Sequence, residues 1–253
     1  GGLKINRNRE IRGVHMTNYE MILQINDKAR ENIKKIKTND KMDKINECLS
    51  FTEDLNQWLS YCGEFKDFVL VKEAQDEFIK SIFMCMQGFY KEAMMTLRQS
   101  LEHMLFAILL STNDYNYRLW KRGKYDMSWT QIVDQQKGIF GKEYINSYAK
   151  DIDGNRSIEL LTIAKNIYRE CSEYVHGNYG KLMLLTENME YNEENVDRYI
   201  EVFESVKYLI SVSLLIRFRE LFDKEEILVK LESVLMDNLG MLPEVQELYN
   251  RER

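Results

Sequence analysis

The chain has very little proline and glycine: one proline and 12 glycines in 253 residues. Average usage would give about 13 and 18. Folds made of many short strands need many turn residues, so this composition excludes β-sandwiches and β-barrels. We therefore expect an all-α fold, a helical bundle.

A long hydrophobic run is also missing. The two longest, at about 105–110 and 209–216, are too short or too interrupted to cross a bilayer, which needs about 20 apolar residues. No signal-peptide pattern is present. Apolar residues still make up 44% of the chain and charged residues 30%, which excludes disorder as the main state. We expect a cytoplasmic protein that has no membrane partner.

Metal and cofactor motifs are missing as well. The four cysteines form no CxxC pair, and there are only three histidines, whereas a structural zinc site needs about four closely spaced ligands. GxxxxGK[ST], GxGxxG, HExxH and GxSxG do not occur. We expect no metal, no cofactor, and free thiols that serve as small core residues in a reducing compartment.

The charge is unevenly distributed. The net charge is −6, so the chain is not a uniformly basic nucleic-acid binder. Residues 1–46, however, hold 11 Lys and Arg against six Asp and Glu. Such a basic arm on an acidic body either contacts a phosphate backbone or forms a solvated helix face.

Helix signals occur along the whole chain. Helices are expected over about 17–36, 40–61, 65–87, 89–110, 157–176 and 192–222, with a short helix capped by Ser128 and Gln131, another from Asp223 to about Gly240, and a last one that begins at Pro243. Thr17 and Glu20 have the spacing of a capping box. We divide the chain into a basic N-terminal helical segment (1–64), a helical bundle (65–222) and C-terminal helices (223–253).

Two stretches have no helical pattern and are expected to be loops, 111–127 and 177–192. The first mixes aromatic with basic residues: Tyr115, Tyr117, Trp120, Lys121, Arg122, Lys124 and Tyr125. This mixture either stacks bases and holds phosphates or packs the loop onto the bundle.

Arg98 and Glu102 are unusual because they fall in an apolar sector of the expected 89–110 helix. Four residues apart, their side chains can meet. A charged pair in such a place is costly unless it is well satisfied. It either fixes the packing of the helix or borders a functional site.

Arg169 and His176 are the main candidates for chemistry. Seven residues apart on one helix, they are within 20° of alignment and about 10 Å apart along the axis, so long side chains can converge on one phosphate. Gly177 has the position of a helix C′ residue, which places His176 at the negative end of the helix dipole, where a cation is favoured. The alternative is a polar helix face that ends in a capping histidine.

This segment resembles HEPN-like proteins. Residues 168–177, Tyr-Arg-Glu-Cys-Ser-Glu-Tyr-Val-His-Gly, are similar to the family's terminal motif, in which an Arg is followed by four to six residues and a His. Residues 88–102 resemble the "A…LR..LE" helix of bacterial HEPN-like defence proteins. The resemblance covers about 75–220.

Three arginine–histidine pairs fit this spacing: Arg9–His15, Arg98–His103 and Arg169–His176. The first lies near a chain end, where fraying is common, and the second pair is 140° apart on its helix. Only Arg169 and His176 lie on the same face of their expected helix. One position departs from the family pattern, because Glu170 stands where nuclease members usually have an amide, an aspartate or a histidine.

The resemblance implies a dimeric bundle that brings two Arg/His motifs together. Active members cut RNA without a metal, by attack of the 2′-hydroxyl on the neighbouring phosphate. His176 would transfer the proton and Arg169 would hold the phosphoryl oxygens. The candidate supporting residues are Ser172, Glu173, Asn178, Tyr179, Arg98 and Glu102.

We therefore expect a metal-independent endoribonuclease of a bacterial antiviral or toxin-type system, acting on RNA as a homodimer. The alternative is a catalytically inactive HEPN-like subunit that regulates another defence-system protein. A third class is a purely structural helical scaffold, in which Arg169 and His176 would be freely replaceable.

Overall fold

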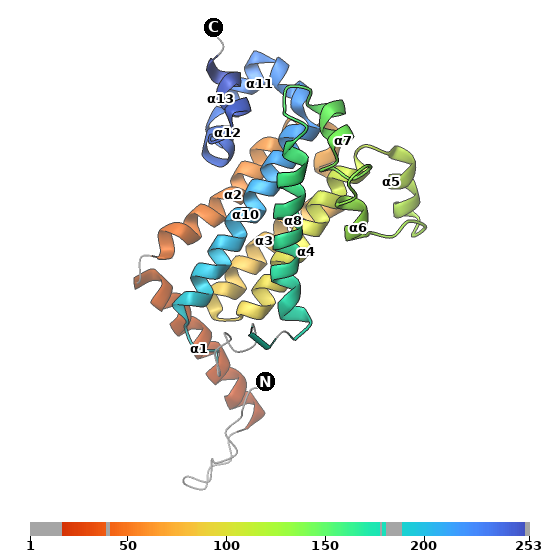
Figure 1. Ribbon diagram of the computed structural model, residues 1–253. Helices are drawn as coiled ribbons and strands as arrows, with labels where there is room; N and C mark the ends of the chain where they lie inside the picture. Colours follow the sequence, from red (N-terminus) through yellow and green to blue (C-terminus); the bar gives the residue numbers. More distant parts are fainter. Residues whose placement is uncertain (1–16, 39–40, 178, 181–188, 251–253) are drawn as a thin grey trace.

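The computed structural model describes residues 17–38, 41–177, 179–180 and 189–250. Within them the chain forms twelve α-helices and two 3₁₀-helices, and no strand. The α-helices are α1 (Asn18–Thr38), α2 (Lys41–Leu59), α3 (Val69–Gln87), α4 (Tyr90–Leu110), α5 (Asp114–Lys121), α6 (Trp129–Ile132), α7 (Lys142–Tyr148), α8 (Arg156–Val175), α10 (Glu193–Arg217), α11 (Glu225–Lys230), α12 (Glu232–Leu239) and α13 (Pro243–Asn250), and the 3₁₀-helices are η1 (Gly63–Asp67) and η3 (Arg219–Asp223). The expected all-α bundle is confirmed (Figure 1).

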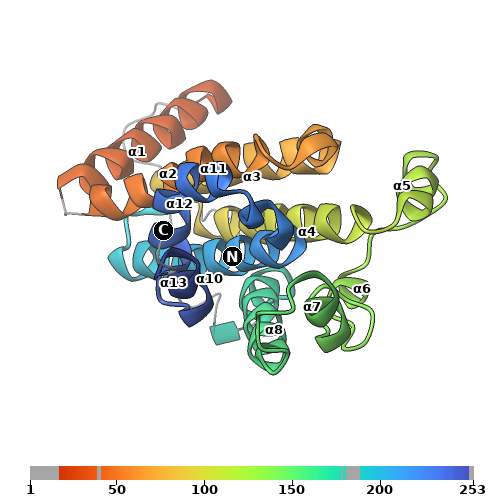
Figure 2. The same ribbon diagram turned by 90° about the horizontal axis from the view of Figure 1, so that it is seen from above.

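The long helices α2, α3, α4, α8 and α10 form the body. Seen from above, α2 and α3 lie on one side and α8 on the other, with α4 and α10 between them (Figure 2). Accordingly α4 contacts α3, α8 and α10, and one hydrophobic cluster extends from Ile36 to Val245. All four cysteines are buried, free thiols, as expected. The division into three segments stays a prediction.

Several helix ends follow the local sequence signals. Thr17 and Glu20 form the expected capping box: the Thr17 amide donates to Glu20 Oε2 at 2.7 Å, and the Glu20 amide donates to Thr17 Oγ1 at 3.2 Å. The Asn192 side chain accepts a hydrogen bond from the Asn195 amide at 2.8 Å, which caps α10. Pro243 is the first residue of α13, as expected.

Other expectations were wrong. Residues 111–127 are not a loop throughout, because they contain α5, whose N-cap Asn113 accepts from the Asn116 amide at 3.0 Å. Ser128 precedes α6, but its hydroxyl bonds to Thr130 instead of capping the helix. The single helix expected from Asp223 to about Gly240 is instead divided into α11 and α12, and Asp223 precedes α11 with its carboxylate paired with Arg219 at 3.3 Å. Helix α7 was missed altogether.

Helix α1 contacts α2 and α3 with its C-terminal half only. Its buried residues are Ala29, Asn32 and Ile36, and Asn32 donates to the carbonyls of Gln87 and Met189 at 2.9 and 2.7 Å. The N-terminal half extends beyond the end of the bundle (Figure 1).

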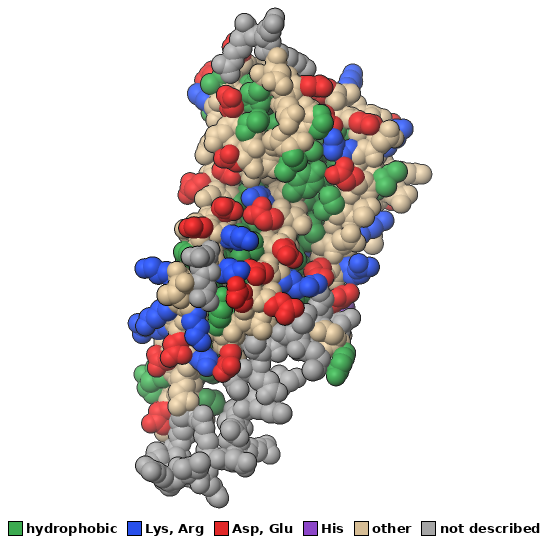
Figure 3. Space-filling model, turned by 60° about the vertical axis from the view of Figure 1, so that its left-hand side comes forward, with side chains coloured by type: hydrophobic (Ala, Val, Ile, Leu, Met, Phe, Trp, Pro, Cys, Tyr) green, Lys and Arg blue, Asp and Glu red, His purple; other side chains and the backbone are tan. Residues whose placement is uncertain are grey.

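The charges near α1 do not form one basic surface. Lys28 pairs with Glu190 at 3.3 Å, and Lys41 pairs with Asp197 at 2.6 Å. Figure 3, which shows this side of the molecule, has positive and negative side chains intermixed. Two cations of this segment, Lys28 and Lys41, therefore neutralise acidic groups of the body.

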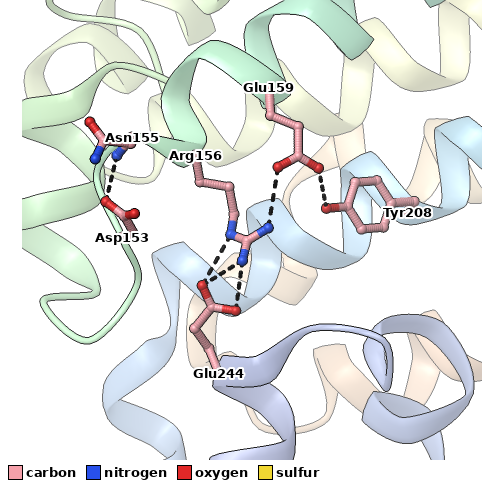
Figure 4. A network of polar contacts seen from close by, with 6 residues as sticks. All are labelled: Asp153, Asn155, Arg156, Glu159, Tyr208 and Glu244. Atoms are coloured by element: carbon pink, nitrogen blue, oxygen red, sulfur yellow. Dashed lines mark hydrogen bonds and ion pairs between the residues drawn. The ribbon is translucent and has the colours of Figure 1, made fainter.

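The C-terminal helices are held to the bundle by polar contacts. Arg156, in the first turn of α8, binds both carboxylate oxygens of Glu244 at 2.6 and 2.8 Å and also reaches Glu159 at 3.2 Å (Figure 4). On the other side of this segment, Asn238 donates to Asp54 of α2 at 2.8 Å. None of the described helices combines the length and apolar composition that crossing a bilayer requires.

Candidate functional site

The site is built on the last two turns of α8. The helix ends because Gly177 adopts φ 70°, a left-handed conformation that favours glycine and stops the helical hydrogen-bond pattern. The His176 amide still donates to the Ser172 carbonyl at 3.0 Å. His176 is therefore the C-cap residue, at the position expected from the sequence.

Arg169 and His176 are both exposed. Neither side chain forms a hydrogen bond or an ion pair with another residue in the described part of the chain. A guanidinium and an imidazole with no structural partner are available to a ligand, and these two groups supply a fixed positive charge and a proton carrier.

Several residues between Arg169 and His176 pack or form hydrogen bonds within the bundle. Cys171 and Tyr174 are buried, and burial raises the pKa of Tyr174 to about 12. Glu170 receives a hydrogen bond from Arg198 Nε of α10 at 2.6 Å, with both side chains partly exposed. The residue that departs from the HEPN-like pattern thus joins α8 to α10. Glu170 thus has a packing role, whereas Arg169 and His176 have no such partner among the residues that the structure describes.

Arg98 joins α4 to the motif helix. Its Nε donates to Glu102 Oε1 at 2.6 Å, so the expected pair is confirmed. Its Nη1 donates to Ser172 Oγ at 3.1 Å and its Nη2 to the Tyr168 hydroxyl at 2.5 Å. The guanidinium carbon also lies 4.1 Å from the centre of the Tyr168 ring. We refer to Arg98, Glu102, Tyr168, Ser172 and Trp129 as the Arg98 cluster.

Trp129 of α6 completes this cluster. Its ring stacks on Tyr168 with centroids 4.4 Å apart and an angle of 15° between the planes. The side chains of Arg98 and Glu102 are each 21% exposed, so the pair is neither fully buried nor free in solvent. The cluster fixes the face of α8 that packs against α4 and leaves the adjacent face, with Arg169, in solvent.

Ser172 differs from expectation. As a supporting residue of the site it should be open to a substrate, but it is only 9% exposed and lies against α4. Its hydroxyl donates to the Tyr168 carbonyl at 2.5 Å and accepts from Arg98. The reason is that an apolar-looking sector of α4 carries an arginine that needs acceptors, and Ser172 and Tyr168 supply them.

The other supporting candidates are placed as follows. Glu173 is half-buried and has an interaction partner. Tyr179 is 78% exposed. Asn178 lies outside the described residues, as do Arg9 and His15. Their roles at a site stay predictions.

His103 belongs to a separate contact between α3 and α4. Its Nδ1 lies 2.7 Å from Glu77 Oε2, and Glu77 is buried at 3% exposure. This explains why the Arg98–His103 spacing does not form a site: the histidine turns toward α3 and the arginine toward α8.

Sequence reasoning missed Tyr168, Trp129 and Glu77. Tyr168 could have been found, because it lies one turn before Ser172 and four residues is the spacing of helix neighbours. Trp129 and Glu77 carry no such local signal. In the described part of the chain, no group of three or more His, Cys, Asp or Glu side chains is arranged to hold a metal ion.

Comparison of the chain with protein-family models, with curated proteins and with solved structures gave no match. The HEPN-like resemblance therefore rests on the two sequence segments, 88–102 and 168–177. In the structure these are parts of α4 and α8, two helices that contact one another through the Arg98 cluster.

Proposed function

We propose that the protein is a metal-independent endoribonuclease in which two copies each contribute Arg169 and His176, and that it acts in a bacterial antiviral or toxin-type system. The observation that carries the proposal is that residues 168–177 divide into side chains that bind or pack within the bundle and side chains that stay exposed. Arg169 and His176 are exposed and unengaged among the described residues, while Tyr168, Glu170, Cys171, Ser172 and Tyr174 bind or pack within the bundle.

The chemistry requires only these two kinds of group. A base takes the proton of the RNA 2′-hydroxyl, and the 2′-oxygen then forms a bond to the adjacent phosphorus. The bond from phosphorus to the 5′-oxygen breaks, and an acid protonates that oxygen. The products are a 2′,3′-cyclic phosphate and a free 5′-hydroxyl. In a dimer one imidazole serves as base and the other as acid, and the guanidinium groups stabilise the charge on the phosphoryl oxygens.

The Arg98 cluster has a positioning role in this proposal. A catalytic group must be held close to its productive geometry, and side chains that are locked by packing achieve this. Three hydrogen bonds and a ring contact from Arg98 fix the helix that carries Arg169.

The test is cleavage of a labelled single-stranded RNA by purified wild type and variants. His176→Ala should lower the rate about 10²–10⁴-fold, the usual contribution of one acid–base group. Arg169→Lys should also lose activity, because an ammonium keeps the charge but cannot bind two phosphoryl oxygens in a planar fork. Lys165→Ala is the matched control, since Lys165 is exposed on the same helix. Wild-type rates in both variants would refute the proposed site.

A second candidate is a catalytically inactive interaction subunit that regulates a partner protein. It is favoured by large apolar side chains exposed on or just after α8: Ile158 is 74% exposed, Val175 41% and Tyr179 78%. Such residues are typical of protein interfaces. Expression of wild type and of His176→Ala in cells separates the two. The nuclease predicts growth arrest and RNA degradation with wild type alone, whereas the subunit predicts intact RNA with both.

A further inference from the structure

Helix α5 projects from the side of the bundle, beyond the C-terminal end of α4 (Figures 1 and 2). None of its residues is buried. Aromatic rings attach it to the body: Tyr117 stacks on Phe68 at 4.4 Å with an angle of 4°, and Tyr125 stacks on Phe106 at 6.1 Å. The inner side of α5, with Tyr117 and Trp120, packs against the hydrophobic core as partly buried side chains, so its outer surface is the part that needs an explanation.

That outer surface is cationic. Between residues 113 and 126 the exposed charged side chains are Asp114, Arg118, Lys121, Arg122, Lys124 and Asp126. This is a net charge of +2 on a chain whose total is −6. Asp114 pairs with Arg118 at 2.6 Å.

The remaining cations are not neutralised. Lys121, Arg122 and Lys124 have no ion-pair partner among the residues that the structure describes. Exposed lysines elsewhere, such as Lys142 and Lys150, also have no ion-pair partner among the described residues, so what sets these three cations apart is that they lie within four residues of one another. Three adjacent cations repel one another, and an anionic ligand would remove that repulsion.

One aromatic ring on α5 is not used for attachment. Tyr115 is 68% exposed, and it is three residues from Arg118 and seven from Arg122, which places the three on one side of the helix. Tyr117 points to the other side, toward Phe68. An exposed ring flanked by cations fits a single-stranded nucleic acid, since a base stacks on the ring while its phosphates meet the cations.

The position of α5 is compatible with the proposed site. Helix α6 lies between α5 and α8 in both views (Figures 1 and 2), and its Trp129 stacks on Tyr168 of α8. We infer that the α5 surface, formed by Tyr115, Arg118, Arg122 and Lys124, is a second RNA-contact surface that holds a single-stranded segment of the substrate beside the Arg169/His176 site; Lys121, whose Nζ lies 5.5 Å from the centre of the Tyr117 ring, is on the inner side of the helix. This inference rests on the proposed function.

The test is binding of a fluorescent, 2′-O-methylated single-stranded RNA, which cannot be cleaved by 2′-hydroxyl attack, measured by anisotropy at several salt concentrations. The triple variant Arg118→Gln/Arg122→Gln/Lys124→Gln should bind at least tenfold more weakly at low salt. The slope of log K against log salt should fall by about 2, since each phosphate contact on a single strand contributes about 0.7.

Two controls make the result specific. The triple variant Lys142→Gln/Lys150→Gln/Lys224→Gln removes the same charge from exposed lysines elsewhere, and it should bind within twofold of wild type. Tyr115→Leu should weaken binding about tenfold, whereas Tyr115→Phe, which keeps a ring, should not. Circular dichroism checks that each variant keeps its helix content.

Failure of this inference is distinguishable from failure of the proposed function. If wild type binds and cleaves RNA and the α5 triple variant matches its control, only the α5 inference is overturned. If wild type binds no RNA, both are. If a polyglutamate peptide binds as tightly as RNA, and the α5 variant loses this binding too, the surface recognises acidic polypeptides. The RNA assignment is then overturned.

Discussion

At the scale of single residues, Arg98 is the side chain that connects α4 to the end of α8, the helix that carries Arg169 and His176. It donates to Glu102 on its own helix and to Tyr168 and Ser172 on α8. A charge at this depth is stable only because each of its nitrogen atoms has an acceptor.

Removing the carboxylate tests this account. Glu102→Ala should reduce the free energy of unfolding by about 1–3 kcal/mol, because a partly desolvated guanidinium loses its charged partner. The measurement is urea denaturation followed by circular dichroism. Glu92→Ala, an exposed position on the same helix, is the control and should change stability by less than about 0.5 kcal/mol. Equal effects of the two substitutions would show that the pair contributes nothing.

Asp54 gives a second prediction at this scale. Burial raises the pKa of its carboxyl above the ordinary value of 3.8, although the hydrogen bond from Asn238 acts in the opposite direction. The folded state therefore holds the proton more tightly than the unfolded chain, and this group's stabilising effect is present below pH 3.8 and is lost as the pH rises through the folded pKa. Asp54→Asn removes the titration, so the melting temperature of the variant relative to wild type should rise between pH 4 and pH 7. Glu53→Gln, on the exposed side of α2, should show no such trend. A difference in melting temperature between Asp54→Asn and wild type that does not change with pH would contradict this account.

At the scale of elements, one ion pair joins α13 to α8. Arg156 and Glu244 join α8 to α13 through two short hydrogen bonds, and their side chains are 16% and 13% exposed (Figure 4). Loss of one partner leaves a charge in a poorly solvated place.

Glu244→Ala should therefore lower the free energy of unfolding by about 3 kcal/mol and release α13 from the bundle. Hydrogen exchange read by mass spectrometry should show faster exchange in residues 243–250, with α4 and α10 unchanged. The exposed Glu247→Ala is the control on the same helix. Unchanged protection of α13 would mean that its apolar contacts suffice.

The elements also show what the sequence predicts and what it does not. Ends that depend on local chemistry, such as the capping box of Thr17 and Glu20 and the first position of Pro243, were predicted correctly. Helix α5 was missed because it has eight residues, fewer than the roughly 11–18 over which an apolar helical period is recognised in a sequence.

The candidate site also has features that the sequence predicts and features that it does not. The helix, its end at Gly177 and the exposure of Arg169 and His176 follow from spacing and local chemistry. The burial of Ser172 and the stack of Trp129 on Tyr168 do not, because they are set by which helix packs against which, and a single sequence carries no direct signal of that.

At the scale of the whole molecule, the proposal needs a second copy. A composite site requires two α8 helices that face each other across a two-fold axis. The exposed face of α8 carries Ile158, which is 74% exposed. Ile158 precedes His176 by about five whole helical turns, so the two side chains lie on the same side of the helix.

We therefore expect a homodimer at micromolar concentration that Ile158→Glu converts to monomers with loss of RNA cleavage. Light scattering measures the mass of each variant. Val69→Glu is the control, because Val69 is 68% exposed on α3, and it should leave the dimer intact. A wild-type protein that stays monomeric with RNA present would count against a composite site.

The most direct measurement of the central claim is cleavage, in EDTA, of one RNA oligonucleotide and of the same oligonucleotide with a single 2′-deoxy substitution at the cleaved position. If Arg169 and His176 form the active site, wild type cuts the first and leaves a 2′,3′-cyclic phosphate, does not cut the second at that position, and His176→Ala cuts neither. If EDTA abolishes cleavage, or if the deoxy substrate is cut at the same position, the reaction does not proceed by metal-independent attack of the 2′-hydroxyl.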